Sequence, residues 1–183
     1  MDNDIKYMIN RIYYEKDYEY FAVKSSKDLI LPRAFYDILS KPGLTVNEWN
    51  SKVNPSRAWT IRYKAYQKGI FKVRYITTLL ISKLVDCYYI QHEFGVENQD
   101  INQMTPVLDG FGCQAYTQDQ EILRNDLSEI LSEVGYRELS YAEVNEAILG
   151  LSYPEGVTIF GPQVIVERAI FYDFLGLSNS DKG

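Results

Sequence analysis

The segment of residues 71–93 (FKVRYITTLLISKLVDCYYIQHE) constrains the fold of this chain more than any other part of it. Its apolar residues, among them Val73, Ile76, Leu80 and Leu84, recur at three- and four-residue steps, and this spacing predicts a helix. Further apolar residues widen the apolar arc to about half of the circumference, as in a helix that is buried on two sides. β-Branched residues leave a strand possible at its first turn.

Capping residues and apolar periodicity predict helices elsewhere in the chain as well. These helices are expected near residues 5–12, from Pro32 to Lys41, after the capping box of Thr45 and Glu48, over 56–68, from Gln118 behind the cap Thr117, and after the capping box of Ser140 and Glu143. Residues 18–23 and 157–160 are predicted strands, and 164–175 fits either a helix or a strand. We therefore expect a mainly α fold, with room for a small two- or three-stranded sheet, and α+β as the alternative.

The length of 183 residues suits one domain, because domains usually span ~100–200 residues. No repeat or linker divides the chain, so residues 1–183 are predicted to form a single globular domain, and residues 178–183 a disordered tail. Two cysteines are too few for a disulfide framework. The most apolar stretch, residues 75–90, contains Lys83 and Asp86 and is too short for a membrane span. A cytoplasmic protein without membrane contact is expected.

Few residues are candidates for catalysis or metal binding. His92 is the only histidine, and no paired Cys or His spacing accompanies it, so neither a metal site nor a cofactor is predicted. Cys113 is a conceivable nucleophile whose only candidate base is His92. No phosphate-binding glycine loop or nucleophile motif occurs. The sequence names no catalytic residue and favours a protein that is not an enzyme.

Charge is distributed very unevenly along the chain. Residues 51–83 hold eight bases and no acid, whereas residues 84–183 hold seventeen acids and four bases. Aromatic residues alternate with Arg57, Arg62, Lys64 and Lys68, a pattern compatible with an anion or nucleic-acid site over 57–75. The acidic half of the chain would oppose a polyanion, so nucleic acid is the less favoured partner. Internal neutralisation of the two halves and a site for a protein partner are the alternatives.

A candidate partner-binding face combines acids and tyrosines of the second half. On a helix, Asp126, Glu129 and Glu133 share one face, and Glu143 and Glu146 are similarly spaced. The chain has sixteen tyrosines, a residue enriched at interfaces. Tyr136 and Tyr141 are the predicted aromatic anchors within this acidic surround.

A small, acidic, tyrosine-rich, cysteine-poor domain without catalytic motifs resembles bacterial and phage proteins that act by binding another protein. Immunity proteins, which neutralise basic nuclease toxins, are one such class. The resemblance implies a non-enzymatic protein-binding module of the immunity or inhibitor type, with a basic protein as its partner. Two alternatives remain open. One is a structural or assembly protein that forms a homo-oligomer, and the other is a nucleic-acid or anion binder using residues 57–75.

Overall fold

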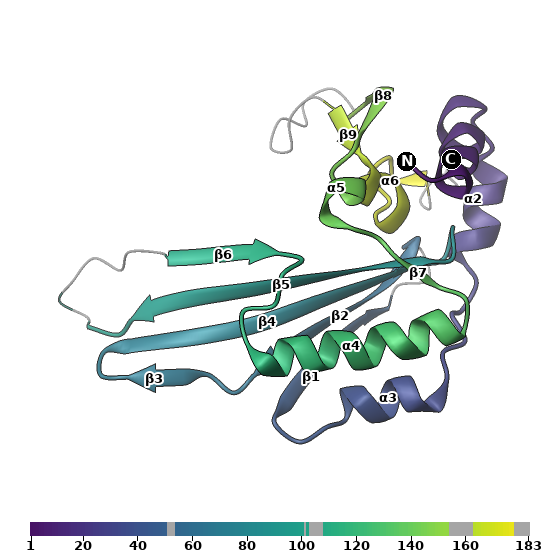
Figure 1. The fold of residues 1–183 in the computed structure, drawn as a ribbon. Coiled ribbons are helices and arrows are strands. Elements are labelled where there is room, and N and C mark those ends of the chain that lie inside the picture. The colour runs from purple at the N-terminus through teal and green to yellow at the C-terminus, as the bar shows by residue number, and fades with distance from the viewer. Residues whose placement is uncertain (51–53, 101, 103–107, 154–162, 178–183) are drawn as a thin grey trace.

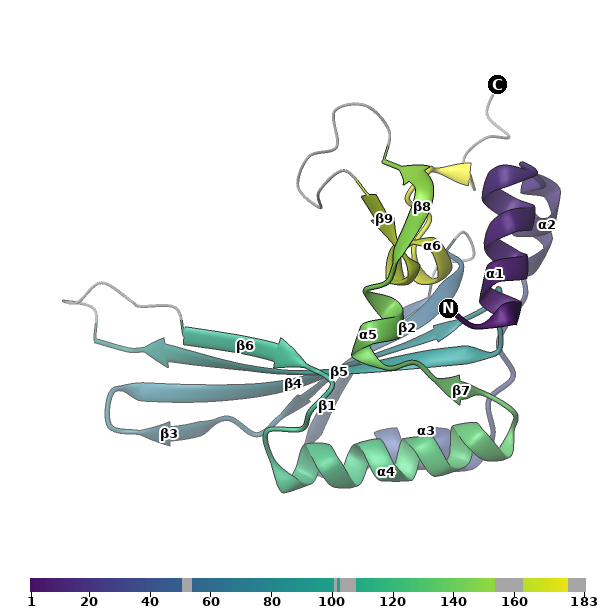
Figure 2. The same ribbon diagram turned by 45° about the horizontal axis from the view of Figure 1, so that its top comes forward.

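The computed structural model describes residues 1–50, 54–100, 102, 108–153 and 163–177 (Figure 1). The prediction of a mainly α fold is wrong, because the architecture is dominated by an antiparallel sheet of seven strands, accompanied by a second sheet of two strands. Helices cover both faces of the large sheet over part of its length (Figure 2).

The large sheet has the strand order β1-β2-β4-β5-β6, and all of these neighbours are antiparallel. Its five main strands are β1 (Leu44–Asn50), β2 (Ser56–Tyr63), β4 (Phe71–Ser82), β5 (Cys87–Asn98) and β6 (Leu108–Gly112). Two short strands extend its edges: β3 (Tyr66–Lys68) pairs with β4, and β7 (Arg137–Glu138) runs parallel to β5.

The helix predicted over residues 71–93 is instead the long hairpin of β4 and β5. Near their turn the two strands are buried on both faces, so apolar residues occupy consecutive positions rather than alternate ones. A short continuous apolar run cannot be told from a buried helix by periodicity alone. The charged residues Lys83 and Asp86, which interrupt the run, lie in the turn that separates the strands.

Three further predictions of local structure are wrong. The helices expected after Thr45 and over residues 56–68 are β1 and the β2–β3 region, where pairing across the sheet overrides the capping signals. The strand expected over residues 18–23 is the helix α2 (Tyr18–Ser25). Asp17 caps this helix by accepting a hydrogen bond from the Tyr20 N–H, and only one side of the helix is buried.

Four predicted helices are confirmed, and each begins at a recognisable cap or proline. They are α1 (Asn3–Ile9), which continues into the π-helical turn η1 (Asn10–Tyr14), α3 (Arg33–Leu39), α4 (Gln118–Glu133) and α5 (Tyr141–Val144). The segment left open between helix and strand contains both, as β9 (Gln163–Ile165) and α6 (Val166–Phe171). β9 pairs with β8 (Ala147–Ser152) in the small sheet.

The predicted strand at residues 157–160 and the predicted tail at 178–183 lie outside the described residues. Of the helices that the structure describes, none combines the length and the apolar character that a membrane crossing requires.

Two hydrophobic cores hold the helices to the sheet. On one face, which we call the lower face, α3 and α4 pack against strand residues such as Trp59, Leu79 and Ile90. On the other, upper face, α1, α5, α6 and the small sheet pack over Leu80 and Tyr89. This three-layered part of the molecule, with helices on both sides of the sheet, is the body.

The rest of the large sheet projects beyond the helices as a single layer (Figures 1 and 2). We call this projection the arm. It consists of β3, the first residues of β4, the last residues of β5, and β6, and spans residues 66–75, 93–98 and 108–112. α4 begins where the arm leaves the body (Figure 1).

Candidate protein-binding surface

The register of the arm brings four apolar residues, distant in sequence, into one row across its lower face. Tyr66 lies opposite Val73, Val73 opposite Val96, and Val96 opposite Leu108. In the body this face is covered by α3 and α4, but on the arm the outer members of the row remain largely exposed, Tyr66 at 58% and Leu108 at 60%. The row is therefore an uncovered continuation of a face that is elsewhere a hydrophobic core.

Aromatic rings extend the row on both sides. Phe71 is exposed at the start of β4, and Phe94 packs edge-on against Tyr116, with 4.8 Å between their ring centroids. Gly110 leaves room for the Phe94 ring, because a Cβ atom at position 110 would lie 2.6 Å from that ring. We call the whole surface the arm's apolar face; it comprises Tyr66, Phe71, Val73, Tyr75, Phe94, Val96, Leu108 and Tyr116.

The upper face of the arm carries charged residues together with one exposed aromatic ring, that of Phe111 on β6. Lys72 lies opposite Glu97, and Arg74 forms an ion pair with Glu97 at 2.7 Å. Apart from Phe111, the arm is amphipathic, with its charges on the upper face and its other aromatic and aliphatic side chains on the lower face. Contiguous exposed apolar surface of this kind marks interaction sites on soluble proteins.

The three acidic residues predicted to share one face of α4 differ in their surroundings: one is ion-paired, and two are exposed. Asp126 forms an ion pair with Lys41 at 2.5 Å. Glu129 and Glu133 are exposed, and no ion pair involves either of them in the part of the chain that the structure describes. These two carboxylates are thus the members of the α4 set that are open to a partner.

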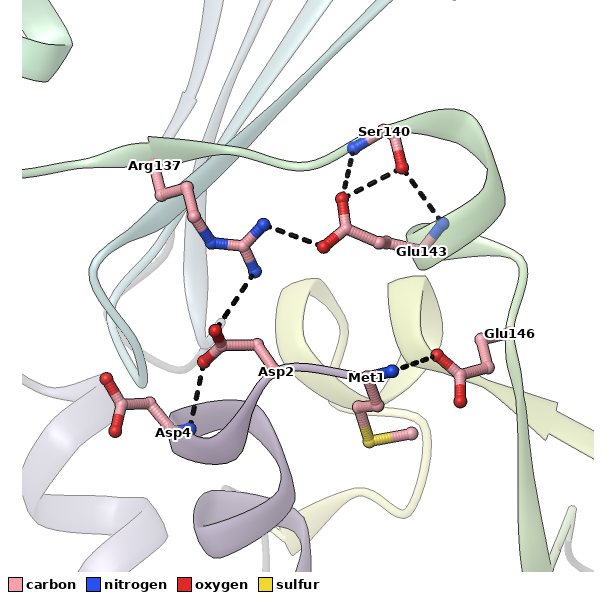
Figure 3. A network of polar contacts seen from close by, with 7 residues as sticks. All are labelled: Met1, Asp2, Asp4, Arg137, Ser140, Glu143 and Glu146. Carbon is pink, nitrogen blue, oxygen red and sulfur yellow. Dashed lines mark hydrogen bonds and ion pairs between the residues drawn. The ribbon is translucent and has the colours of Figure 1, made fainter.

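Glu143 and Glu146 belong to a polar network that ties α5 to the start of α1 (Figure 3). Glu143 accepts hydrogen bonds from the N–H and hydroxyl of Ser140 and from Arg137, the last at 2.7 Å. Burial alone would raise the pKa of the Glu143 carboxyl, but these hydrogen bonds outweigh it and lower the pKa to about 2. Glu146 forms an ion pair with the Met1 amino group at 2.7 Å. Both carboxylates are already satisfied within the protein.

The two predicted aromatic anchors differ in accessibility. Tyr136 is half-buried and packs against the lower core, whereas Tyr141 is 44% exposed at the start of α5. The seven predicted partner-binding residues consequently do not form one continuous exposed face. Of these seven residues, Glu129, Glu133 and Tyr141 are exposed.

The basic residues predicted to form an anion site over 57–75 do not share a helix: Arg57, Arg62 and Lys68 lie on strands, and Lys64 lies between β2 and β3. Arg57 is 8% exposed on the lower face, where it donates to Glu48 at 2.6 Å and to the Leu29 carbonyl and the Tyr36 hydroxyl. Arg62 points to the upper face, opposite Ile76. Arg62, Lys64 and Lys68 are exposed, so they are the members of this set that are accessible to an anion.

His92 lies inside the lower core. Its Nδ1 atom is 2.9 Å from the Thr77 hydroxyl, which in turn is 3.0 Å from the Tyr63 hydroxyl. Burial lowers the pKa of His92 to about 4, so the imidazole is neutral at physiological pH. No hydrogen bond joins Cys113 to His92, because the His92 Nδ1 atom is bonded to Thr77 and its Nε2 atom has no hydrogen-bond partner among the described residues.

One sequence pattern indicates a strand of the arm. Residues 93–97 (EFGVE) alternate between polar or small residues and the apolar Phe94 and Val96, as expected for a strand with one apolar face. This pattern coincides with the end of β5. The pattern does not predict that Val96 pairs with Val73 and Leu108, because the register of a strand is set by the whole sheet.

Within the described ranges, no three His, Cys, Asp or Glu side chains are grouped so as to hold a metal ion. Comparison of the chain with models of known protein families, with curated protein sequences and with solved structures found no match in any of the three.

Proposed function

We propose that this protein is a protein-binding module and that it docks its partner on the arm's apolar face. The exposure of Tyr66 and Leu108, in a row whose inner members are Val73 and Val96, carries the proposal. β-Sheets of soluble proteins normally bury such a face against helices or a second sheet. On the arm, a partner would supply that missing layer.

The partner that fits best is a basic protein with an apolar patch at the centre of its contact surface. The chain has a formal net charge of −6, and the first turn of α4, beside the arm, carries Asp119 and Glu121. The exposed Glu129 and Glu133 continue this negative charge along the helix. Complementary charge of this kind raises association rates, while apolar contacts at the centre set dissociation. An inhibitor that neutralises a basic partner is one function of this type.

The proposal is tested by photo-crosslinking in the native cell, with a benzophenone amino acid placed at position 108 or at position 109. Leu108 faces the apolar side of the arm, and its neighbour Asp109 faces the polar side opposite Gly95, which makes it a matched control. We expect an adduct to a basic protein from position 108 only. Adducts of equal yield from both positions would contradict the proposal.

Binding kinetics measured with the purified partner identified in this way separate the contribution of the apolar contact area from that of the charged residues. Leu108→Asp should weaken binding by at least tenfold, mainly through faster dissociation, whereas a Glu129→Gln/Glu133→Gln double variant should slow association in a salt-sensitive manner. An adduct to a second copy of this chain would favour a homo-oligomer instead and would overturn the choice of a basic partner.

A further inference from the structure

Two adjoining cavities lie across the strands on the upper face of the large sheet, beside α6. One, of about 300 Å³, is lined by residues of β1, β2 and β4, and the other, of about 370 Å³, by residues of β4, β5 and β6. Both are lined by Thr78, Leu80 and Tyr172, so together they form one groove, which we call the upper groove. It shares no residue with the arm's apolar face and does not depend on the docking function proposed above.

The floor of the upper groove contains a row of uncharged polar side chains that crosses four strands. Asn47 lies opposite Thr60, Thr60 opposite Thr78, and Thr78 opposite Gln91. Asn47 is exposed and the other three are half-buried, so none of the four is shut off from solvent. Hydroxyl and amide groups both donate and accept hydrogen bonds. The row therefore offers a neutral hydrogen-bonding surface to a ligand that carries groups of the same kind.

An exposed aromatic ring lies at each end of the upper groove. Trp49, on β1, is 66% exposed, and Phe111, on β6, is 65% exposed. Trp49 lies opposite Ala58 and Phe111 opposite Glu93, and this register places both rings on the upper face. β1 and β6 are four strand spacings apart, which corresponds to roughly 19 Å or more between the two rings. The two rings provide flat apolar platforms at the ends of a polar floor.

The charges along the upper groove are few and partly compensate one another. No charged residue of the described part of the chain lines the first cavity, and the second is lined by Glu93, Glu167 and Arg168. Burial raises the pKa of Glu167, and the charge of Arg168, whose guanidinium lies 4.7 Å from the centre of the Tyr172 ring, opposes this shift. Glu93 accepts a hydrogen bond of 3.1 Å from Gln91. Sites for single-stranded nucleic acid combine aromatic rings with positive charge, and this lining lacks the positive charge.

An extended peptide also fits the upper groove less well than its dimensions suggest. Peptides that bind a sheet in extended form usually add to a free edge, where backbone groups are open. Beneath the groove, the backbones of β1, β2, β4 and β5 are already paired with one another. Only side-chain groups are left to recognise a ligand on this face, and they are hydroxyls, amides and aromatic rings.

We propose that the upper groove binds a neutral oligosaccharide. A sugar ring has C–H groups on its faces, which pack on aromatic rings, and hydroxyl groups around its rim, which donate and accept hydrogen bonds. Trp49 and Phe111 each stack on one sugar ring, and Thr60, Thr78 and Gln91 bond the hydroxyls of the units between them. The separation of the two platforms suits a chain of several units rather than a single sugar.

The test uses the purified full chain and follows the fluorescence of Trp49. The chain has two tryptophans, and Trp59 is 1% exposed in the lower core, so a change on binding reports on Trp49. The probes are the neutral hexasaccharides of glucose, mannose, xylose and N-acetylglucosamine, with hexauridylate and an uncharged hexapeptide as competing classes of ligand. We expect a saturable change at millimolar concentration with at least one hexasaccharide. Absence of binding by all four, or tighter binding of the RNA or the peptide, would overturn the proposal.

Three variants of groove residues and one control make the test specific, with calorimetry as the readout and the hexasaccharide that binds as the probe. Trp49→Ala and Phe111→Ala should each weaken binding by at least tenfold, because each removes a stacking platform. Thr78→Val, which removes a hydroxyl and nearly preserves the shape, should cause a smaller loss. Phe71→Ala removes an exposed ring from the opposite face of the sheet and should bind as the wild type does. Unaltered binding by Trp49→Ala and Phe111→Ala, or an equal loss in Phe71→Ala, would contradict the assignment.

Discussion

The two halves of the β4–β5 hairpin are built from one continuous pair of strands, yet their surroundings differ completely. In the body half, Leu79, Leu80 and Ile81 are each at most 4% exposed, because helices cover both faces of the sheet. In the arm half, Phe71 is 47% exposed although its strand pairing continues to Asn98. The strands are longer than the core requires. The comparison indicates that the body half provides stability and that the arm half provides surface.

Replacing one leucine in each half should give the largest difference in the free energy of unfolding between the two halves. Leu79→Ala removes a fully buried side chain from the lower core and should lower the free energy of unfolding by roughly 2–5 kcal/mol. Leu108→Ala, on the exposed arm, should change it by less than about 0.5 kcal/mol. Urea denaturation measures both. Similar losses in the two variants would show that the arm contributes to the core.

A pair of arginines gives the next largest contrast. Arg57 is buried and donates to three groups, so Arg57→Ala should cost roughly 2–3 kcal/mol of unfolding free energy. Arg74 forms an exposed ion pair with Glu97 on the arm, and Arg74→Ala should cost less than about 1 kcal/mol. If added salt reduced the contribution of Arg57 to the free energy of unfolding as strongly as that of Arg74, the assignment of Arg57 as a buried, stabilising residue would be wrong.

The body half should also respond to acid through His92. Its pKa is about 4 in the folded protein and about 6.5 in an unfolded chain, so below pH 6.5 the unfolded state binds the proton that the folded state excludes. Stability is therefore complete above pH 6.5 and falls as the pH decreases toward 4, by roughly 1–2 kcal/mol at pH 5. His92→Gln should be less stable at pH 7 but should lose less stability between pH 7 and pH 5. An equal loss in both proteins would assign the pH dependence to other groups.

A glycine pair provides the smallest and most local contrast, within the arm itself. Gly110→Ala places a methyl group against the Phe94 ring and should cost about 1 kcal/mol while moving the rings of Phe94 and Tyr116. Gly95→Ala, where no atom lies within 4 Å of the added Cβ, should be neutral or slightly stabilising. Ring-proton chemical shifts of Tyr116 report the movement, and unchanged shifts in Gly110→Ala would show that the ring packing tolerates the methyl group.

The sequence predicts local features of this fold better than its sheet. The helix α4 could be recognised because Thr117 caps it and Leu123, Leu127 and Leu131 mark a single buried face. The β4–β5 hairpin could not, because burial on both faces removes the alternation that identifies a strand. This is the main reason why the mainly α fold predicted from the sequence is wrong.

The candidate sites depend on pairing even more strongly than the fold does. Tyr66, Val73, Val96 and Leu108 become neighbours only through the register of four strands. The predicted acids are recognisable as charges, but Asp126 and Glu146 are paired with the distant Lys41 and Met1, while Glu143 is paired with the nearby Arg137. Composition thus identified an acidic protein with many aromatic residues, and tertiary structure decides which of them remain available.

The proposal that another protein covers the arm's apolar face can be tested without knowing the partner. In a Cys113→Ser background, Leu108→Cys and Asp109→Cys are labelled with a membrane-permeant thiol reagent, in the purified protein and in the native cell. The buried Cys87 thiol has a pKa raised to about 12 and should react negligibly. We predict that both positions react readily in the purified protein, and that position 108 alone becomes protected in the cell. Equal reactivity of the two positions in the cell, or protection of position 108 already in the purified protein, would contradict the account.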